Sequence, residues 1–197
     1  MTAVSFDSPR RYLADVWAGV WARDVALVVA GTALITLSAF AIVPLPFTPV
    51  PITLATLGVM GTGAALGPAR GAASALLYLV IGALGAPVFA GGASGVLLPT
   101  FGYIVGYVVA AFIVGQLARR RADRRVLTTL ALGGVGTLSL YLCGVPWLAV
   151  SLRIDLGQAV LLGVVPFLVG DAIKVLALSG MLPAAWRLVA RVEGRRR

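Results

Sequence analysis

The chain has 197 residues, of which 60% are apolar and 12% charged, and its net charge is +9. A soluble domain carries about 25% charged residues, so this composition excludes an ordinary soluble enzyme or binding module. The sequence has no histidine and one cysteine, which excludes a metal site built from those residues. It also has no Walker-type glycine-rich sequence ending in Gly-Lys-Ser or Gly-Lys-Thr, so we do not expect it to hydrolyse ATP by that route.

Six apolar segments follow one another along the chain, separated by proline, glycine and charge clusters. A helix needs about 20 predominantly apolar residues to cross the hydrocarbon of a bilayer. The expected spans cover approximately residues 23–43, 52–66, 72–85, 100–118, 126–150 and 157–182. The second and third are short, so we expect parts of the flanking loops to lie at membrane depth. The sequence therefore predicts a single all-α integral membrane domain with six transmembrane helices.

Two further segments flank these spans. Residues 8–21 contain Arg10, Arg11, Trp17 and Trp21, a composition that suits a helix lying in the membrane interface. Residues 183–197 form a basic tail after the sixth span. Anchoring at the level of the lipid headgroups is the simplest role for both segments.

The positive charges indicate how the spans are oriented. With the N-terminus in the cytoplasm, fourteen of the sixteen basic residues lie in inside segments, Arg153 lies in an outside loop, and Lys174 lies within the sixth span. Cytoplasmic loops carry such an excess of basic residues, and this asymmetry arises only with an even number of spans. We therefore expect both termini in the cytoplasm. Because topology accounts for the basic residues, nucleic acid is not an expected partner.

The outer connections under this topology are candidate lids over a ligand pocket. Four prolines between residues 44 and 51 remove backbone donors and stiffen the first outer loop. The second loop, residues 86–99, is rich in glycine, so its backbone can approach a ligand closely. The candidate contacts of a small ligand are Phe47, Phe89, Gly91, Gly92, Tyr103 and Tyr141. Each aromatic residue taken singly is more often a packing residue than a ligand contact.

Asp171 and Lys174 are the residues that point most directly to function. Asp171 is the only acidic residue in the interior of an expected span, since Asp24 lies at the edge of the first one, and Lys174 is the only lysine of the chain. Charges inside a membrane are costly, normally face the interior of the bundle and mark function. Residues three apart share one face of a helix, so both side chains can enter one cavity. There lysine would meet a carboxylate, and aspartate would accept N–H donors from the other end of the ligand. The alternatives are a purely structural ion pair, or side chains that extend outward to the headgroups.

Small residues recur on the first span. Ala22, Ala26 and Ala30 fall at intervals of four, a spacing that lets another membrane helix approach closely. Periodicity alone does not distinguish docking of a separate membrane protein from packing inside the bundle.

Several stretches together resemble the BioY family, the biotin-specific substrate-binding components of energy-coupling factor transporters. They lie in the family's order over nearly the whole chain: Pro44–Thr53, Leu66–Gly71, Tyr78–Gly95, Pro99–Tyr103, Gly144–Leu148 and Pro166–Lys174. The sequence departs from the family pattern at Val169, where proline is usual. This change leaves Asp171 and Lys174 in register.

The resemblance implies a biotin-binding subunit in the cytoplasmic membrane, with no cofactor. It implies six transmembrane helices, a biotin pocket near the outer face, and ligand contacts by Asp171 and Lys174. It also implies docking, through small residues on the first helix, to a transmembrane coupling subunit and a pair of ABC-type ATPases. Ala22, Ala26 and Ala30 fit that docking role.

Two other functions compete with this one. A self-sufficient secondary carrier would use the Asp171–Lys174 pair to couple a small carboxylate to protons. An intramembrane enzyme would need a nucleophile with a base, or a metal. The chain offers no histidine and only one embedded acid–base pair, so an enzyme is not expected.

Overall fold

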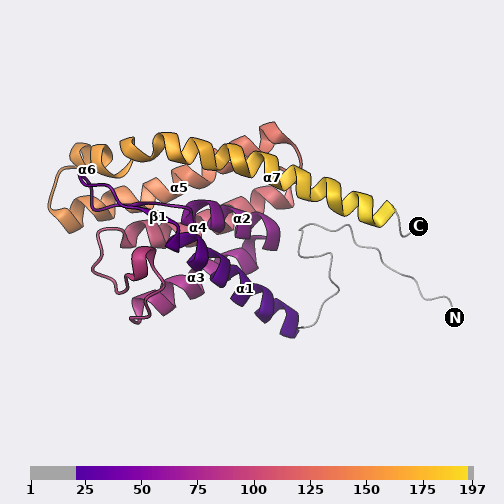
Figure 1. The fold of residues 1–197 in the computed structure, drawn as a ribbon, viewed down its shortest axis with the longest axis horizontal. Coiled ribbons are helices and arrows are strands. Elements are labelled where there is room, and N and C mark those ends of the chain that lie inside the picture. Colours follow the sequence, from indigo (N-terminus) through magenta and orange to yellow (C-terminus); the bar gives the residue numbers. More distant parts are fainter. Residues whose placement is uncertain (1–20, 195–197) are drawn as a thin grey trace.

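The computed structural model describes residues 21–194, and helices make up most of them (Figure 1). The elements in chain order are α1 (Trp21–Phe40), β1 (Ile42–Val43), β2 (Ile52–Thr53), α2 (Ala55–Leu66), α3 (Pro68–Ala83), η2 (Ala90–Gly92), α4 (Phe101–Arg119), α5 (Val126–Leu152), α6 (Leu156–Gly163), η3 (Val165–Phe167) and α7 (Leu168–Gly194). The expected interfacial helix over residues 8–21 lies outside the described residues, except for Trp21, which begins α1.

Four stretches of the described chain are long and apolar enough to cross a membrane. They are α1, α4, α5 and the stretch from Leu156 to Val192, which contains α6 and α7. Helices α2 and α3 are apolar but shorter, as the sequence predicts for the second and third spans. The chain is therefore an all-helical membrane protein that crosses the bilayer more than once.

The last expected span differs from the structure at two places. It is divided, because α6 ends at Gly163 and α7 begins at Leu168, with the short helix η3 between them. Pro166 lies in this break, and its missing N–H cannot continue an α-helical hydrogen-bond ladder. The second difference is that α7 continues past Leu182 to Gly194 in spite of Pro183.

A contact between α7 and the α4–α5 loop accompanies this extension. The Trp186 indole N–H donates to Asp123 Oδ2 at 2.5 Å, and the Arg124 guanidinium lies 4.0 Å from the centre of the Trp186 ring. Asp123 is fully buried, and burial raises the pKa of its carboxyl above the ordinary value. These contacts fix the continuing helix against the loop.

Helix α4 lies at the centre of the bundle and approaches its neighbours through small residues. A Cβ at Gly63 on α2 would stand 2.5 Å from the Ala111 carbonyl oxygen of α4. A Cβ at Gly115 would stand 2.5 Å from the backbone nitrogen of Pro68, and one at Gly106 would stand 3.0 Å from the Cα of Leu140. Close backbone approach through small residues is how membrane helices gain packing energy in the absence of a hydrophobic driving force.

Gly63→Ala should therefore destabilise the protein, whereas Gly61→Ala on the same helix should not. The new methyl group at position 63 meets backbone that cannot rotate away, and overpacking costs about 1–3 kcal/mol. Nothing lies within 4 Å of a Cβ at position 61, so alanine there gains helix propensity of about 0.5–1 kcal/mol. Thermal unfolding in detergent measures both; equal midpoints for the two variants would contradict this packing.

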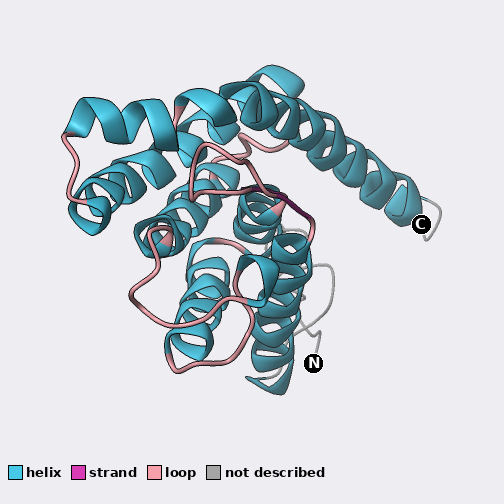
Figure 2. Ribbon diagram, turned by 60° about the vertical axis from the view of Figure 1, so that its left-hand side comes forward, coloured by secondary structure: helices cyan, strands magenta, loops and turns pink. Residues whose placement is uncertain are grey.

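The connection between α1 and α2 contains a small ribbon that an all-α prediction omits. Strands β1 and β2 pair antiparallel, with Ile42 opposite Thr53 and Val43 opposite Ile52. Figure 2 shows this ribbon as a short interruption in an otherwise helical structure. The pairing satisfies backbone groups of a loop that adjoins the apolar bundle.

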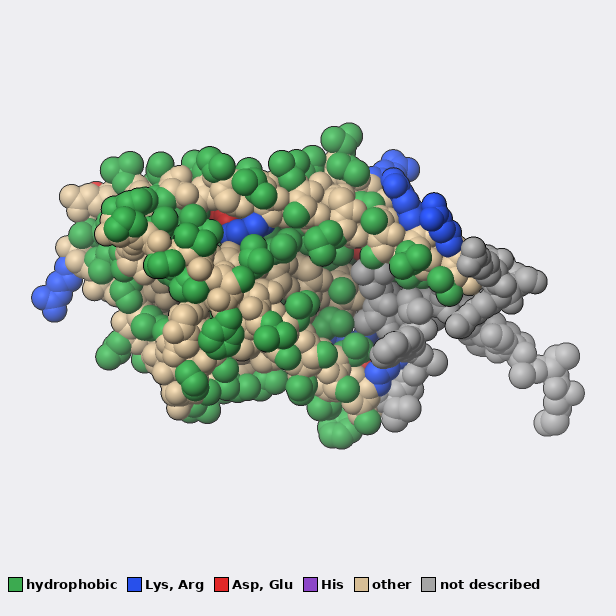
Figure 3. All heavy atoms as spheres, in the orientation of Figure 1, with side chains coloured by type: hydrophobic (Ala, Val, Ile, Leu, Met, Phe, Trp, Pro, Cys, Tyr) green, Lys and Arg blue, Asp and Glu red, His purple; other side chains and the backbone are tan. Residues whose placement is uncertain are grey.

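Charged and apolar side chains are separated on the surface. Long apolar side chains are exposed along the outside of the helices, including Leu37, Leu127 and Val169 at 70%, 79% and 73%. Figure 3 shows Lys and Arg side chains gathered mainly at one end, and Figure 1 places the described ends of α1 and α7 at that end. The exposed arginines at the end of α4, in the α4–α5 loop and in α7 are Arg119, Arg120, Arg121, Arg125, Arg187 and Arg191.

Candidate ligand-binding site

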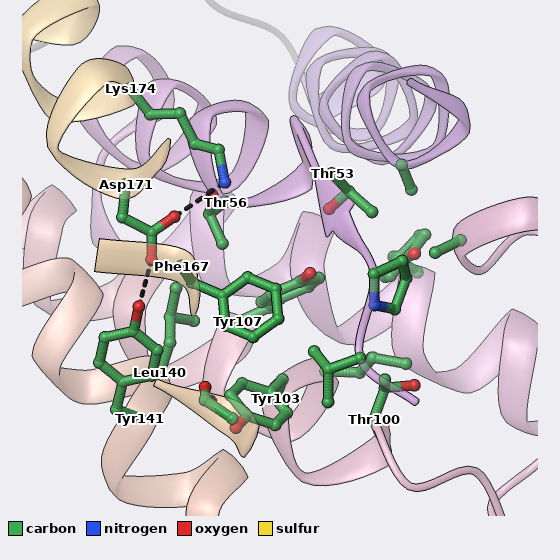
Figure 4. Close-up of a pocket in the computed structure, with 17 residues that line it drawn as sticks. Thr53, Thr56, Thr100, Tyr103, Tyr107, Leu140, Tyr141, Phe167, Asp171 and Lys174 are labelled. Carbon is green, nitrogen blue, oxygen red and sulfur yellow. Dashed lines mark hydrogen bonds and ion pairs between the residues drawn. The ribbon is translucent and has the colours of Figure 1, made fainter. Parts of the chain in front are cut away.

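A cavity lies inside the bundle, and all seven α-helices contribute to its wall (Figure 4). Segments adjoining the helices complete it, namely the end of the α1–α2 loop, η2 and η3. The lining residues are Ala39, Val50, Pro51, Thr53, Thr56, Tyr78, Ala90, Thr100, Tyr103, Ile104, Tyr107, Leu140, Tyr141, Gly163, Phe167, Asp171 and Lys174. Most of this wall is aromatic or aliphatic, with hydroxyl groups and one pair of charges, which is typical of small-molecule sites.

The pair of charges is Asp171 and Lys174, both on α7. The Lys174 amine lies 2.8 Å from Asp171 Oδ1, and the Tyr141 hydroxyl donates to Asp171 Oδ2 at 2.5 Å. Asp171 is 7% exposed and Lys174 is 6% exposed. The lysine therefore does not extend outward to the headgroups, and the charges face one another across one turn of helix.

The geometry refines how this pair would meet a ligand. Both Asp171 oxygens already have a partner, whereas Asp171 is the one partner recorded for the Lys174 amine within residues 21–194. An ammonium group has three N–H donors, so Lys174 keeps donors for a further acceptor. The sequence interpretation gave lysine a carboxylate and aspartate the opposite end of the ligand. The structure brings both charges to one end of the cavity (Figure 4).

Tyrosine side chains form the middle of the wall. The Tyr103 hydroxyl donates to the Gly163 carbonyl oxygen at 2.9 Å, and its ring meets Tyr141 edge to face with centroids 6.5 Å apart. Tyr78 and Tyr107 lie 6.1 Å apart, centroid to centroid. Their rings offer flat apolar surface to a compact ring system, and the hydroxyl of Tyr103 is occupied by protein.

Two glycines allow Tyr103 to occupy its position. A Cβ at Gly144 would stand 2.3 Å from the Tyr103 ring, and a Cβ at Gly163 would stand 2.2 Å from its hydroxyl oxygen. Any larger residue at either position would force the Tyr103 ring to shift. Helices α5 and α6 thus both adjoin this tyrosine of α4, one at its ring and the other at its hydroxyl group.

Four of the eight ligand contacts expected from sequence lie in this wall. They are Tyr103, Tyr141, Asp171 and Lys174. Phe47 is 60% exposed and lies outside the wall, and Phe89 is 1% exposed and packs edge to face on Tyr78 with centroids 5.2 Å apart. Phe89 also fills the space at Gly82, where a Cβ would stand 2.2 Å from its ring.

Gly91 and Gly92 belong to η2 and have φ angles of +67° and +78°, which favour glycine. Their neighbour Ala90, rather than either glycine, lines the cavity. Val169, the position that departs from the family pattern, is 73% exposed and also lies outside the wall.

Several lining residues were not singled out from the sequence. Tyr107 and Thr56 lie in strongly apolar helices where every face looks alike. The others lie in stretches that resemble the family, but nothing in those stretches distinguishes them from their neighbours: Thr53, Tyr78, Thr100 and Phe167. These residues could have been identified from the sequence only if the inward-facing side of each helix had been known. The described residues contain no group of three metal-binding side chains.

Tyr141→Phe should weaken ligand binding moderately without unfolding the protein. Hydrogen bonds to charged groups contribute about 1.5–3 kcal/mol, and losing this one leaves Asp171 free to compete for the Lys174 donors. We expect a loss of affinity of about threefold to tenfold, which is less than the whole bond because the effect on the ligand is indirect. Titration of the purified variant with biotin measures the affinity. An affinity equal to that of the wild type would show that the Tyr141 hydroxyl does not contribute to ligand binding.

Comparison with known proteins shows to which family this chain belongs. The family model described as the BioY family matches residues 8–191. The chain belongs to the BioY family. A probable biotin transporter BioY of Pyrococcus horikoshii is 42% identical over 156 residues, covering 78% of this chain and 90% of that protein. The biotin transporter BioY of Rhizobium etli is 36% identical, covering 80% and 91%.

A solved structure agrees with the fold of this BioY-family chain. It is the crystal structure of the S-component for biotin from an ECF-type ABC transporter, matched with a TM-score of 0.75 and 25% identity. The match covers 86% of this chain and 95% of the other. The resemblance stated from sequence is therefore confirmed at the level of family and fold.

Proposed function

We propose that this chain is the biotin-binding membrane subunit of an energy-coupling factor transporter. It captures biotin at the outer face, and ATP-driven partner subunits bring about delivery to the inside. The observation that carries the proposal is the buried Asp171–Lys174 pair in the wall of an internal cavity. Relatives named as biotin transporters, and the S-component for biotin, support biotin over other small carboxylates and transport over catalysis.

The wall of the cavity suits the chemistry of biotin. Biotin combines a compact apolar ring system, a ureido group and a carboxylate on a flexible chain. In this proposal Lys174 binds the carboxylate with its remaining donors, and Asp171 and Tyr141, which bond within this charge cluster, hold the amine in position. Tyr103 and the buried Phe167 offer apolar surface to the rings.

The outer loops act as lids in this proposal. The loop that carries Phe47 is attached to the α6–η3 region, because the Thr48 hydroxyl donates to the Leu162 carbonyl oxygen at 2.8 Å. The second lid is the segment with Gly91 and Gly92, whose neighbour Ala90 reaches the cavity. Phe89 fixes this segment to the bundle by packing on Tyr78.

The membrane arrangement follows from the distribution of charge. We infer six membrane spans in the cytoplasmic membrane, with both termini in the cytoplasm. The end of the molecule with the α4–α5 loop and the C-terminal part of α7 carries the exposed arginines, as cytoplasmic ends do. Arg153, between α5 and α6, is then on the outer side.

The partner surface in this proposal is one face of α1. Ala22, Ala26 and Ala30 are all exposed, so internal packing does not occupy them in the described part of the chain. A flat strip of small side chains admits close approach of a second membrane helix. We assign it to the coupling subunit, which joins two ABC-type ATPases to the binding subunit.

Uptake into vesicles tests the function. The protein is reconstituted alone or with the coupling subunit and ATPases, with or without ATP inside, and radiolabelled biotin is supplied outside. Accumulation should require the complete module and ATP, and should survive collapse of the proton gradient. Accumulation by the protein alone that stops when the gradient collapses would identify a secondary carrier instead.

A further inference from the structure

One hydroxyl group in the cavity wall has no partner within residues 21–194. Thr56 lines the cavity, and its Oγ1 is buried without a hydrogen bond. Three other hydroxyl groups of the wall already have a partner within the protein. Tyr103 donates to Gly163, Tyr141 donates to Asp171, and Thr53 accepts from the Ala55 N–H at 3.2 Å. An unsatisfied buried hydroxyl is costly, so a ligand that supplies an acceptor here would recover that cost.

The position of Thr56 in the chain removes one common partner for its hydroxyl. Several hydroxyls on other helices of the bundle bond to the carbonyl oxygen four residues earlier, as Thr36 does to Thr32 and Ser139 does to Val135. Thr56 lies in the first turn of α2, and the residue four positions earlier, Ile52, belongs to strand β2. The usual intrahelical acceptor is therefore missing at this position.

The unused donors of Thr56 and Lys174 lie at the same end of the cavity. Figure 4 shows the Lys174 side chain reaching down from α7 with its amine toward Thr56. The two groups make no hydrogen bond to each other, since Thr56 Oγ1 has no recorded partner. A ligand oxygen held between them would accept from both.

The backbone favours negative charge at the same place. Thr56 is the second residue of α2, which begins at Ala55 and has 12 residues. The N-terminus of a helix carries partial positive charge, which stabilises an anionic group near its first turn. The dipole of α2 thus acts in the same direction as the Lys174 ammonium.

We propose that Thr56 donates a hydrogen bond to the ligand oxygen that Lys174 binds, so that α2 and α7 hold one anionic group between them. The inference rests on the proposed function, in which that group is the carboxylate of biotin. Asp171 and Tyr141 position the amine, and Thr56 supplies the second donor. The site for the anionic group is therefore shared between two helices and depends on their separation.

Substitution of Thr56 tests the first part of this proposal. Thr56→Val keeps the shape of the side chain and removes the hydroxyl, and it should weaken biotin binding on the order of 10-fold to 100-fold, as expected for a hydrogen bond to a charged group. Thr56→Ser keeps the hydroxyl and should bind within about threefold of wild type. Biotin titration of each purified variant in detergent provides the affinities.

Thr62→Val is the matched control. Thr62 lies on the same helix, and its Oγ1 is also buried without a partner, but it does not line the cavity. Its substitution should leave the affinity for biotin unchanged. If Thr62→Val weakens binding as much as Thr56→Val does, the effect comes from α2 as a whole and the assignment to Thr56 is overturned.

A double-mutant cycle tests whether the two donors share one oxygen. The losses of binding free energy caused by Thr56→Val and Lys174→Met should not be additive, because each variant lacks one of two donors to the same ligand group. Additive losses would overturn the shared site. Absence of biotin binding to the wild-type protein would reject the proposed function itself, whereas wild-type binding that Thr56→Val leaves intact would reject only this inference.

Discussion

Lys174→Met is expected to weaken biotin binding by about 30-fold to several thousand-fold, the largest effect of any single change in the site. Removing one partner of a buried, hydrogen-bonded charge pair costs about 2–5 kcal/mol, and each 1.4 kcal/mol is a factor of ten. The variant loses the donors for the ligand carboxylate and also the partner that Asp171 has at 2.8 Å. The methionine side chain keeps the apolar stem of lysine in place, so the protein should remain folded.

The control for this variant is Arg153→Asn. Arg153 is an exposed cation between α5 and α6 with a φ of +56°, a conformation that asparagine tolerates. Its removal changes the net charge by the same amount but should leave the affinity for biotin unchanged. Comparable losses for the two variants would mean that the overall charge, rather than the buried amine, attracts the ligand. An unchanged affinity for Lys174→Met would remove the lysine from the site.

Ala26→Leu is expected to reduce the amount of coupling subunit that co-purifies with the protein by about tenfold or more, while biotin binding stays unchanged. Ala26 lies in the middle of the exposed alanine strip on α1, and it does not line the cavity. A leucine side chain there separates the two helix backbones, and a loss of about 1.4 kcal/mol in the interface is already a factor of ten. Biotin affinity should not change, because the substituted face points away from the site.

An exposed alanine on another helix provides the comparison. Ala131 lies on α5 and is also exposed, so Ala131→Leu adds the same side chain to a surface outside the alanine strip. We expect it to co-purify with the coupling subunit as the wild type does. Wild-type assembly of the Ala26→Leu variant would mean that the coupling subunit docks elsewhere.

The positions of the helices could be predicted because each apolar run ends at a proline, a glycine or a charge cluster. The second expected span, residues 52–66, corresponds to α2 at Ala55–Leu66, and the fifth, residues 126–150, corresponds to α5 at Val126–Leu152. The break between α6 and α7 was not predicted, because Pro166 in an apolar run is compatible with a kinked helix as well as with a divided one. The continuation of α7 is accompanied by the contact of Trp186 with Asp123, which no local pattern indicates.

The candidate site could be predicted where charge made it conspicuous. Asp171 and Lys174 are costly in lipid and three residues apart, so their shared face follows from the helix alone. The aromatic wall could not be predicted, because membrane helices are apolar on every side and their inward faces have no distinct pattern. Phe89 and Tyr78 both lie in motifs of the family, yet one packs behind the wall and the other forms it. Thr56 is conspicuous only once its missing acceptor is seen.

Calorimetric titration of the purified protein with biotin is the most direct measurement of whether the cavity beside Lys174 is a biotin site. We expect saturable binding of one biotin per chain, strongly weakened by Lys174→Met and unaffected by Arg153→Asn. Absence of saturable binding in the folded wild-type protein, or equal affinities for all three proteins, would contradict the account.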